Sequence, residues 1–126
     1  MTNFCFQIYL RLFLKKYPPY LTIILYFRNS YRKTTILQRY KSCKNVEIDK
    51  HLEFPGALKY TLKSIVCHAG RSVIAGHYFT YTKTSLGWMK FDDDTVSPIK
   101  NETRLLGRVG KNKNSTAYVL LYEHDE

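Results

Sequence analysis

The sequence predicts an α+β protein that consists mostly of one antiparallel β-sheet. Its apolar runs are short, rich in β-branched and aromatic residues, and separated by polar loops, which is the composition of strands. The stretch Thr84-Ser85-Leu86-Gly87 lies between two such runs and predicts a hairpin turn. The 126 residues have the size of one small domain, long enough to bury a core.

The strands are expected in the following order along the chain. The apolar spacing of residues 4–16 fits a helix or a strand equally well. Pro18 and Pro19 then impose an extended entry into the first clear strand. The expected strands are residues 20–27, 60–67, 76–82, 88–92 and 117–122.

The segments between these strands are expected to be irregular. Residues 29–50 are polar and basic and predict a surface excursion, and residues 54–56 (Phe-Pro-Gly) predict a turn. Residues 95–114 are polar and contain Pro98, Gly107 and Gly110, so we expect a long connection there.

The charge of the chain is concentrated in its first half. The net charge is +10, and residues 1–50 contribute +8 of it, from ten Lys and Arg against two acids. Tyrosines interleave with the basic residues of 28–50, a pattern that can bind single-stranded nucleic acid. No recognised nucleic-acid motif accompanies them, so a solvated face is the preferred interpretation and polyanion binding a weaker hypothesis.

Cysteine usage and hydropathy indicate an intracellular protein that does not span a membrane. Cys5, Cys43 and Cys67 match neither a disulfide framework nor a paired-cysteine zinc pattern. The apolar start of the chain is interrupted by charges. Its longest charge-free run, residues 17–27, has eleven residues, whereas a membrane-spanning helix needs about 20.

His77 and the acids after Phe91 are the candidate catalytic residues. If the chain folds into a hairpin at 84–87, position 77 is expected to lie opposite 92 or 93, with Cβ atoms about 4.5–5.5 Å apart. An imidazole bonded to a carboxylate is the base-and-orienter half of a catalytic triad. A structural histidine beside a solvated acidic turn is the alternative, and hairpin geometry alone does not choose between Asp92 and Asp93.

Several separated motifs in one order carry a resemblance to a known family. Gly76-His77-Tyr78, Trp88, Phe91-Asp92-Asp93 and residues 117–122 resemble the C-terminal histidine box of ubiquitin-specific proteases, which are papain-like cysteine peptidases. Residues 17–25, 50–55 and 60–62 are similar to the segments that precede this box in the family. The resemblance divides the chain into a poorly defined segment 1–16, a partial catalytic domain 17–122 and an acidic tail 123–126.

The resemblance implies a role for each residue of the box. His77 would be the general base, Asp92 would orient its imidazole, and Asp93 would assist as a further acid. Gly76 and Tyr78 would line the channel that holds the Gly-Gly end of ubiquitin. No cofactor is implied, and no structural metal is expected because the paired cysteines of the family's finger region are missing from this sequence.

The nucleophile that the family uses has no counterpart in these residues. Nothing resembles the Gly-x-x-Asn-x-Gly-Asn-Thr-Cys box, and Cys67 is expected to be a small buried side chain. The predicted function is therefore that of a deubiquitinase fragment, inactive alone, with ubiquitin, ubiquitinated proteins and the missing N-terminal part of the domain as partners. The alternative is a noncatalytic module that binds ubiquitin or another protein.

Overall fold

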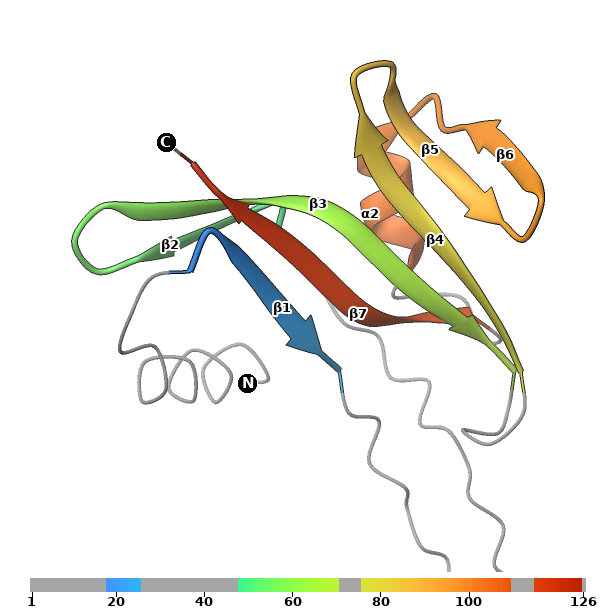
Figure 1. Cartoon of the computed structure of the whole chain (residues 1–126), viewed down its shortest axis with the longest axis horizontal. Helices are drawn as coiled ribbons and strands as arrows, with labels where there is room; N and C mark the ends of the chain where they lie inside the picture. Colours follow the sequence, from blue (N-terminus) through green and yellow to red (C-terminus); the bar gives the residue numbers. More distant parts are fainter. Residues whose placement is uncertain (1–17, 26–47, 71–75, 110–114, 126) are drawn as a thin grey trace, which may run out of the picture.

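The computed structural model describes residues 18–25, 48–70, 76–109 and 115–125 (Figure 1). Residues 4–16, Cys5, Cys43 and most of the predicted excursion 29–50 lie outside these ranges. No helix among the described residues is long and apolar enough to cross a membrane. The described elements are β1 (Tyr20–Ile24), β2 (His51–Phe54), β3 (Leu58–Ala69), β4 (His77–Thr84), β5 (Gly87–Asp92), β6 (Thr95–Pro98), α2 (Glu102–Val109) and β7 (Ser115–His124).

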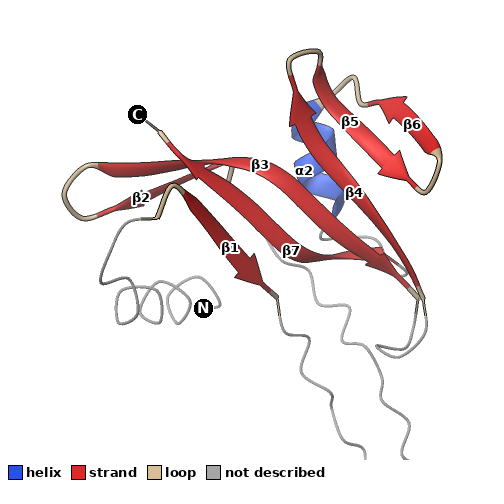
Figure 2. Ribbon diagram, viewed as in Figure 1, coloured by secondary structure: helices blue, strands red, loops and turns tan. Residues whose placement is uncertain are grey.

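One antiparallel sheet holds every described strand (Figure 2). The strand order is β1-β7-β3-β4-β5-β6, and β2 pairs with β3 outside this path. The long strand β3 pairs with β7 along most of its length, with β2 near its start and with β4 near its end. The predicted fold, mostly antiparallel sheet with little helix, is confirmed.

The hydrophobic core lies on the face of the sheet that α2 covers. Leu21 and Ile23 of β1 are buried, whereas their neighbours alternate to the other face, as expected of a strand with one side packed. The remaining buried hydrophobic residues are Ile48, Tyr60, Leu62, Ile65, Cys67, Trp88, Leu105, Val109, Ala117, Leu120 and Tyr122.

Two tyrosine hydroxyls anchor irregular backbone to the edge of this core. Tyr60 donates a hydrogen bond to the carbonyl of Pro18 at 2.7 Å, and Tyr122 donates to the carbonyl of Asp49 at 2.6 Å. Both rings are buried, so each hydroxyl satisfies a polar group that would otherwise be costly to remove from water.

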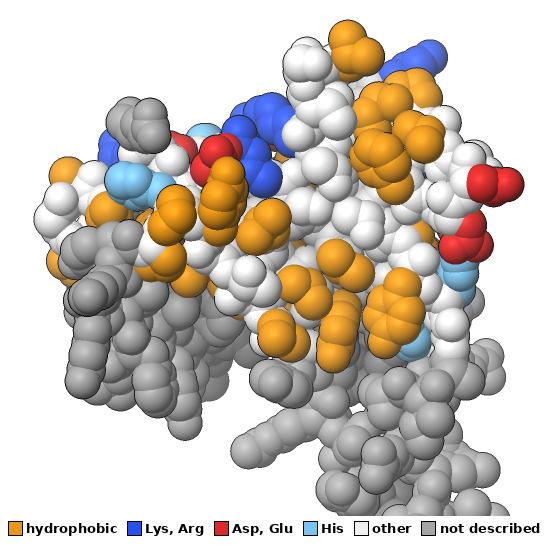
Figure 3. Space-filling view, viewed as in Figure 1, with side chains coloured by type: hydrophobic (Ala, Val, Ile, Leu, Met, Phe, Trp, Pro, Cys, Tyr) orange, Lys and Arg blue, Asp and Glu red, His pale blue; other side chains and the backbone are white. Residues whose placement is uncertain are grey.

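The opposite face of the sheet carries exposed apolar side chains. Hydrophobic atoms gather there in several areas of the visible surface, one of them near the lower centre of the view (Figure 3). The strand registers assign several exposed residues to this face. They are Tyr20, Ile24, Tyr78, Phe91 and Val96.

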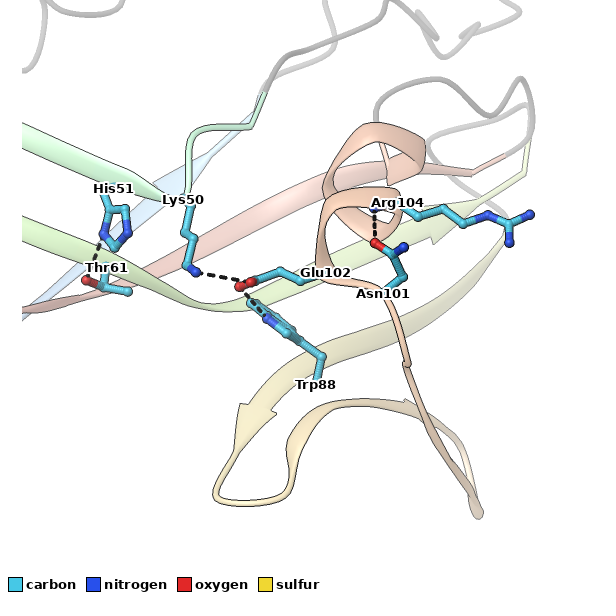
Figure 4. A network of polar contacts seen from close by, with 7 residues as sticks. All are labelled: Lys50, His51, Thr61, Trp88, Asn101, Glu102 and Arg104. Carbon is cyan, nitrogen blue, oxygen red and sulfur yellow. Dashed lines mark hydrogen bonds and ion pairs between the residues drawn. The ribbon is translucent and has the colours of Figure 1, made fainter.

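The prediction of an irregular connection over 95–114 is wrong, because these residues contain β6 and α2. The Asn101 side chain caps the helix by accepting the Arg104 backbone N–H at 3.0 Å (Figure 4). Glu102 ties the first turn to the sheet by accepting from Trp88 Nε1 at 2.9 Å and from Lys50 Nζ at 3.0 Å. Strand β2 was not predicted either, and β7 extends through two residues of the expected acidic tail.

Candidate active site

The β4–β5 hairpin supports both candidate catalytic residues. Thr84 pairs with Gly87, so the turn has two residues, Ser85 and Leu86. Gly87 has φ +103°, a backbone conformation that suits glycine. The predicted turn at 84–87 is thereby confirmed.

The register brings His77 and Asp92 together diagonally. The expectation that position 77 lies directly opposite 92 or 93 is wrong, because the pair Thr80–Phe91 places Asp92 opposite Phe79 when the register is continued. His77 lies two residues from Phe79, on the same face of β4. Diagonal neighbours are about 7–8 Å apart at their backbones, which long side chains can bridge.

His77 and Asp92 form a hydrogen-bonded pair. His77 Nε2 donates to Asp92 Oδ1, and because an ionised carboxylate only accepts, the neutral ring carries its proton on Nε2. The other ring nitrogen, Nδ1, is then the one that can take a proton. The pair lies at the surface, with side-chain exposures of 47% for His77 and 30% for Asp92.

The charges around this pair favour an imidazolium beside a carboxylate. The hydrogen bond that His77 donates to Asp92 raises the pKa of His77, and the negative charges of Asp92 and Asp93 act in the same direction. The hydrogen bonds from His77 and Lys90 lower the pKa of Asp92. Lys90 Nζ lies 3.2 Å from Asp92 Oδ2, so each carboxylate oxygen has its own partner.

Asp93 lies next to the pair, in the turn between β5 and β6. It has φ +51°, a left-handed conformation that aspartate tolerates better than most residues. His77, Asp92 and Asp93 each offer one possible metal-ligand atom, and these three atoms lie within 4.8 Å of one another. This spacing could hold a cation weakly. The ammonium of Lys90 already neutralises Asp92, so the contacts present are those of an acid–base pair.

Gly76 and Tyr78 surround His68, a buried histidine for which the sequence predicted no role. A Cβ at Gly76 would lie 2.3 Å from His68 Nε2 and 2.4 Å from the carbonyl oxygen of Ala69. His68 is 3% exposed, and its ring centroid lies 4.7 Å from that of Tyr78. The pairs His68–Tyr78 and Ala69–His77 place Tyr78 on the opposite face of β4 from His77.

Cys67 does not occupy the position of a nucleophile. Its side chain is 1% exposed in β3, between Phe79 and Ala117 of the neighbouring strands. It lies at the wall of a half-open pocket of about 330 Å³, together with Tyr81 and Leu105. A thiol this deeply buried is inaccessible to a protein substrate, as expected of a buried small side chain.

Comparisons with known proteins place this chain in a family. Residues 5–122 match the family model described as ubiquitin carboxyl-terminal hydrolase. In an alignment of 110 positions that covers 75% of this chain, it is 31% identical to ubiquitin carboxyl-terminal hydrolase 23 of Arabidopsis thaliana. It is 45% identical over 67 residues, 52% of its length, to ubiquitin carboxyl-terminal hydrolase 13 of Saccharomyces cerevisiae.

Solved structures agree with this relationship. The Ubp8-Sgf11-Sgf73-Sus1 SAGA DUB module contains a chain that matches 88% of this one, with a TM-score of 0.68 and 27% identity. A DUB module bound to monoubiquitin matches 86%, with a TM-score of 0.63 and 27% identity. The chain belongs to the ubiquitin carboxyl-terminal hydrolase family. It spans 12% and 9% of the two curated relatives and about a quarter of the solved chains.

Proposed function

We propose that this chain supplies the general base and its orienting acid to a deubiquitinase, an enzyme that hydrolyses the bond after the C-terminal glycine of ubiquitin. The observation that carries the proposal is the hydrogen bond from His77 Nε2 to Asp92 Oδ1 in a member of this family. A carboxylate that holds one ring nitrogen leaves the other to accept a proton from a nucleophile.

The nucleophile in this mechanism is a cysteine thiol outside these 126 residues. His77 Nδ1 takes the thiol proton, and the thiolate attacks the carbonyl carbon at the end of ubiquitin. The imidazolium gives its proton to the leaving amine, and a thioester remains. His77 then draws a proton from water, which attacks the thioester and releases ubiquitin with the thiol restored.

The electrostatics of the pair support this cycle. Asp92 raises the pKa of His77 and thereby stabilises the imidazolium that forms in the first step. Asp92 itself stays ionised, because its own pKa is lowered. In this proposal Asp93 contributes through its charge, and Gly76 and Tyr78 border the path of the ubiquitin C-terminus.

A noncatalytic ubiquitin-binding module is the second candidate function. The exposed apolar face with Tyr20, Ile24 and Tyr78 favours it, because contiguous apolar surface commonly marks a protein contact. In the deubiquitinase proposal, the rest of a catalytic domain would cover part of this face. In the second proposal ubiquitin binds, and its affinity is the same in His77→Ala.

A chimera tests the deubiquitinase proposal. Residues 17–122 would replace the corresponding segment of a relative that matches most of the chain, such as hydrolase 23 of Arabidopsis thaliana. Cleavage of a fluorogenic ubiquitin amide would be measured first for the unaltered relative and then for the chimera. We expect an active chimera that loses about 10⁴-fold or more of its kcat in His77→Ala, the scale seen when a triad member is removed. Lys63→Met, which removes a surface ion pair with Glu123, is the matched control.

Two outcomes would contradict the proposal. One is a folded chimera whose activity survives His77→Ala, which would show that another group acts as the base. The other is hydrolysis by the 126-residue chain alone, where we expect none. Turnover by this chain that depends on Cys5 or Cys67 would place the nucleophile within it.

A further inference from the structure

Lys90 contacts the side of Asp92 that His77 leaves free. Lys90 and Asp92 are two residues apart in β5 and therefore point to the same face. Lys90 Nζ lies 3.2 Å from Oδ2, while Oδ1 accepts from His77. The carboxylate is thus held between an imidazole and an ammonium group, each on a different oxygen.

An aromatic ring fixes the position of this ammonium group. Lys90 Nζ lies 4.5 Å from the centroid of the Phe79 ring, within the range of a cation–π contact. Phe79 in turn packs edge-on against Tyr81 at 5.6 Å and lies against the His77 ring at 6.3 Å. The Lys90 side chain is 30% exposed, so neighbours confine it more than they would a fully solvated lysine.

We propose that Lys90 is a positioning residue of the candidate active site, which holds Oδ2 of Asp92 so that Oδ1 stays directed at His77 Nε2. The torsion that turns a carboxylate is broad and nearly two-fold, so one partner on one oxygen restrains it weakly. A second partner on the other oxygen fixes the plane of the group. The His77 ring then keeps the tautomer with its proton on Nε2, and Nδ1 stays free to act as the base. The effect of Lys90 on turnover rests on the proposed function, whereas its effect on the geometry of Asp92 and His77 does not.

The charge of Lys90 and its positioning role have opposite effects on His77. The positive charge of Lys90 lowers the pKa of His77, whereas the hydrogen bond that His77 donates to Asp92 raises this pKa and the charge of Asp93 adds to the rise. Loss of the charge alone would therefore raise the pKa of His77 and leave the ring tautomer unchanged. Loss of positioning would weaken the hydrogen bond and release the tautomer, so the tautomer separates the two roles.

NMR of the 126-residue chain tests the proposal. Long-range ¹H–¹⁵N correlation at a pH above the pKa of His77 measures the ratio of the Nε2–H and Nδ1–H tautomers. We expect Lys90→Met and Lys90→Gln to increase the Nδ1–H population about two- to fivefold, the range expected from one partly exposed ion pair. Lys90→Arg, which keeps a cationic donor, should preserve the wild-type ratio, as should the control Lys63→Met.

The outcomes are distinguishable from those of the chimera assay. A wild-type tautomer ratio in either neutral variant, with native signal dispersion elsewhere, would overturn the positioning role. An equal shift in Lys63→Met would also overturn it, because the effect would then be nonspecific. The measurement needs neither ubiquitin nor a nucleophile, so an inactive chimera would leave it intact, and a failed tautomer test would leave the chimera result standing.

Discussion

Gly76 should tolerate no side chain, because the space where a Cβ would stand is already filled. In Gly76→Ala the new methyl group would lie 2.3 Å from His68 Nε2 and 2.4 Å from the Ala69 carbonyl oxygen. The carbonyl belongs to the β3 backbone, which pairs with β4 at this point. The His68 ring is buried and rests against the ring of Tyr78. Neither neighbour can move without disturbing other contacts.

The size of the effect follows from the cost of overpacking. An extra methyl group forced into a packed site costs about 1–3 kcal/mol. A domain of this length loses about 4 °C of Tm for each kcal/mol, from an unfolding entropy of about 2.1 cal/mol/K per residue. Gly76→Ala should therefore lower the Tm by about 4–12 °C. Thermal unfolding followed by circular dichroism measures this, and urea unfolding checks that the m-value is unchanged.

Gly107→Ala is the matched control, because nothing lies within 4 Å of a Cβ built there. Gly107 is inside α2, where alanine should stabilise by about 0.5–1 kcal/mol and raise the Tm by about 2–4 °C. If Gly76→Ala melts within about 2 °C of the wild type while the control behaves as expected, the reasoning is refuted. The ring of His68 would then yield at little cost, and the packing beneath the candidate base would be loose.

The remaining predictions concern the candidate base and the core. Asp92→Asn should lower the pKa of His77 toward its ordinary value of 6.5, because the hydrogen bond to the carboxylate is the largest cause of the rise. A raised folded-state pKa gives stability that is present below pH 6.5 and is lost as the pH rises through the folded value. The stability gap between wild type and Asp92→Asn should therefore shrink over that range, and an NMR titration with an unchanged His77 pKa would disprove the pairing. Tyr122→Phe removes the hydroxyl that donates to the Asp49 carbonyl at 2.6 Å and should cost about 0.5–1.5 kcal/mol in urea unfolding. Equal stability would mean that another donor replaces the hydroxyl.

The sequence identified the hairpin and the interacting pair but not how they meet. The turn at 84–87 was readable from its polar and glycine residues. The relation between 77 and 92 depends on which turn residues are unpaired, and a two-residue turn places Asp92 opposite Phe79. His77 and Asp92 are therefore diagonal neighbours, and they meet only because their side chains are long enough. The alternation of apolar and polar residues in the sequence does not reveal this.

Helix α2 was missed because most of what holds it lies far away in the chain. It has eight residues with Gly107 inside, so its intrinsic preference for helix is weak. Its anchors are Trp88 and Lys50, which are 14 and 52 residues from Glu102. One local signal was available, since Asn101 before Glu102 is a favoured start of a helix.

The burial of His68 was not predicted, because a buried histidine has no signature in a single sequence. Its position beneath Gly76 arises from pairing between β3 and β4, which are separated by residues 71–75. The glycine was recognised, but its packing partner could be found only in three dimensions.

Strand β3 changes phase at the irregular pairing between Leu62 and Ser64. Before this point the side chains of β3 that point into the core are even-numbered, Tyr60 and Leu62. After it they are odd-numbered, Ile65 and Cys67. Lys63 acts as a one-residue spacer that lets two amphipathic half-strands of opposite parity share a single core. Deletion of Lys63 would turn the core-facing side chains of the second half of β3 to the opposite face of the sheet. Strand β4, which carries His77, would then have to shift its register or detach. The presence of a residue at position 63, whatever its side chain, therefore sets the alignment on which the candidate site depends.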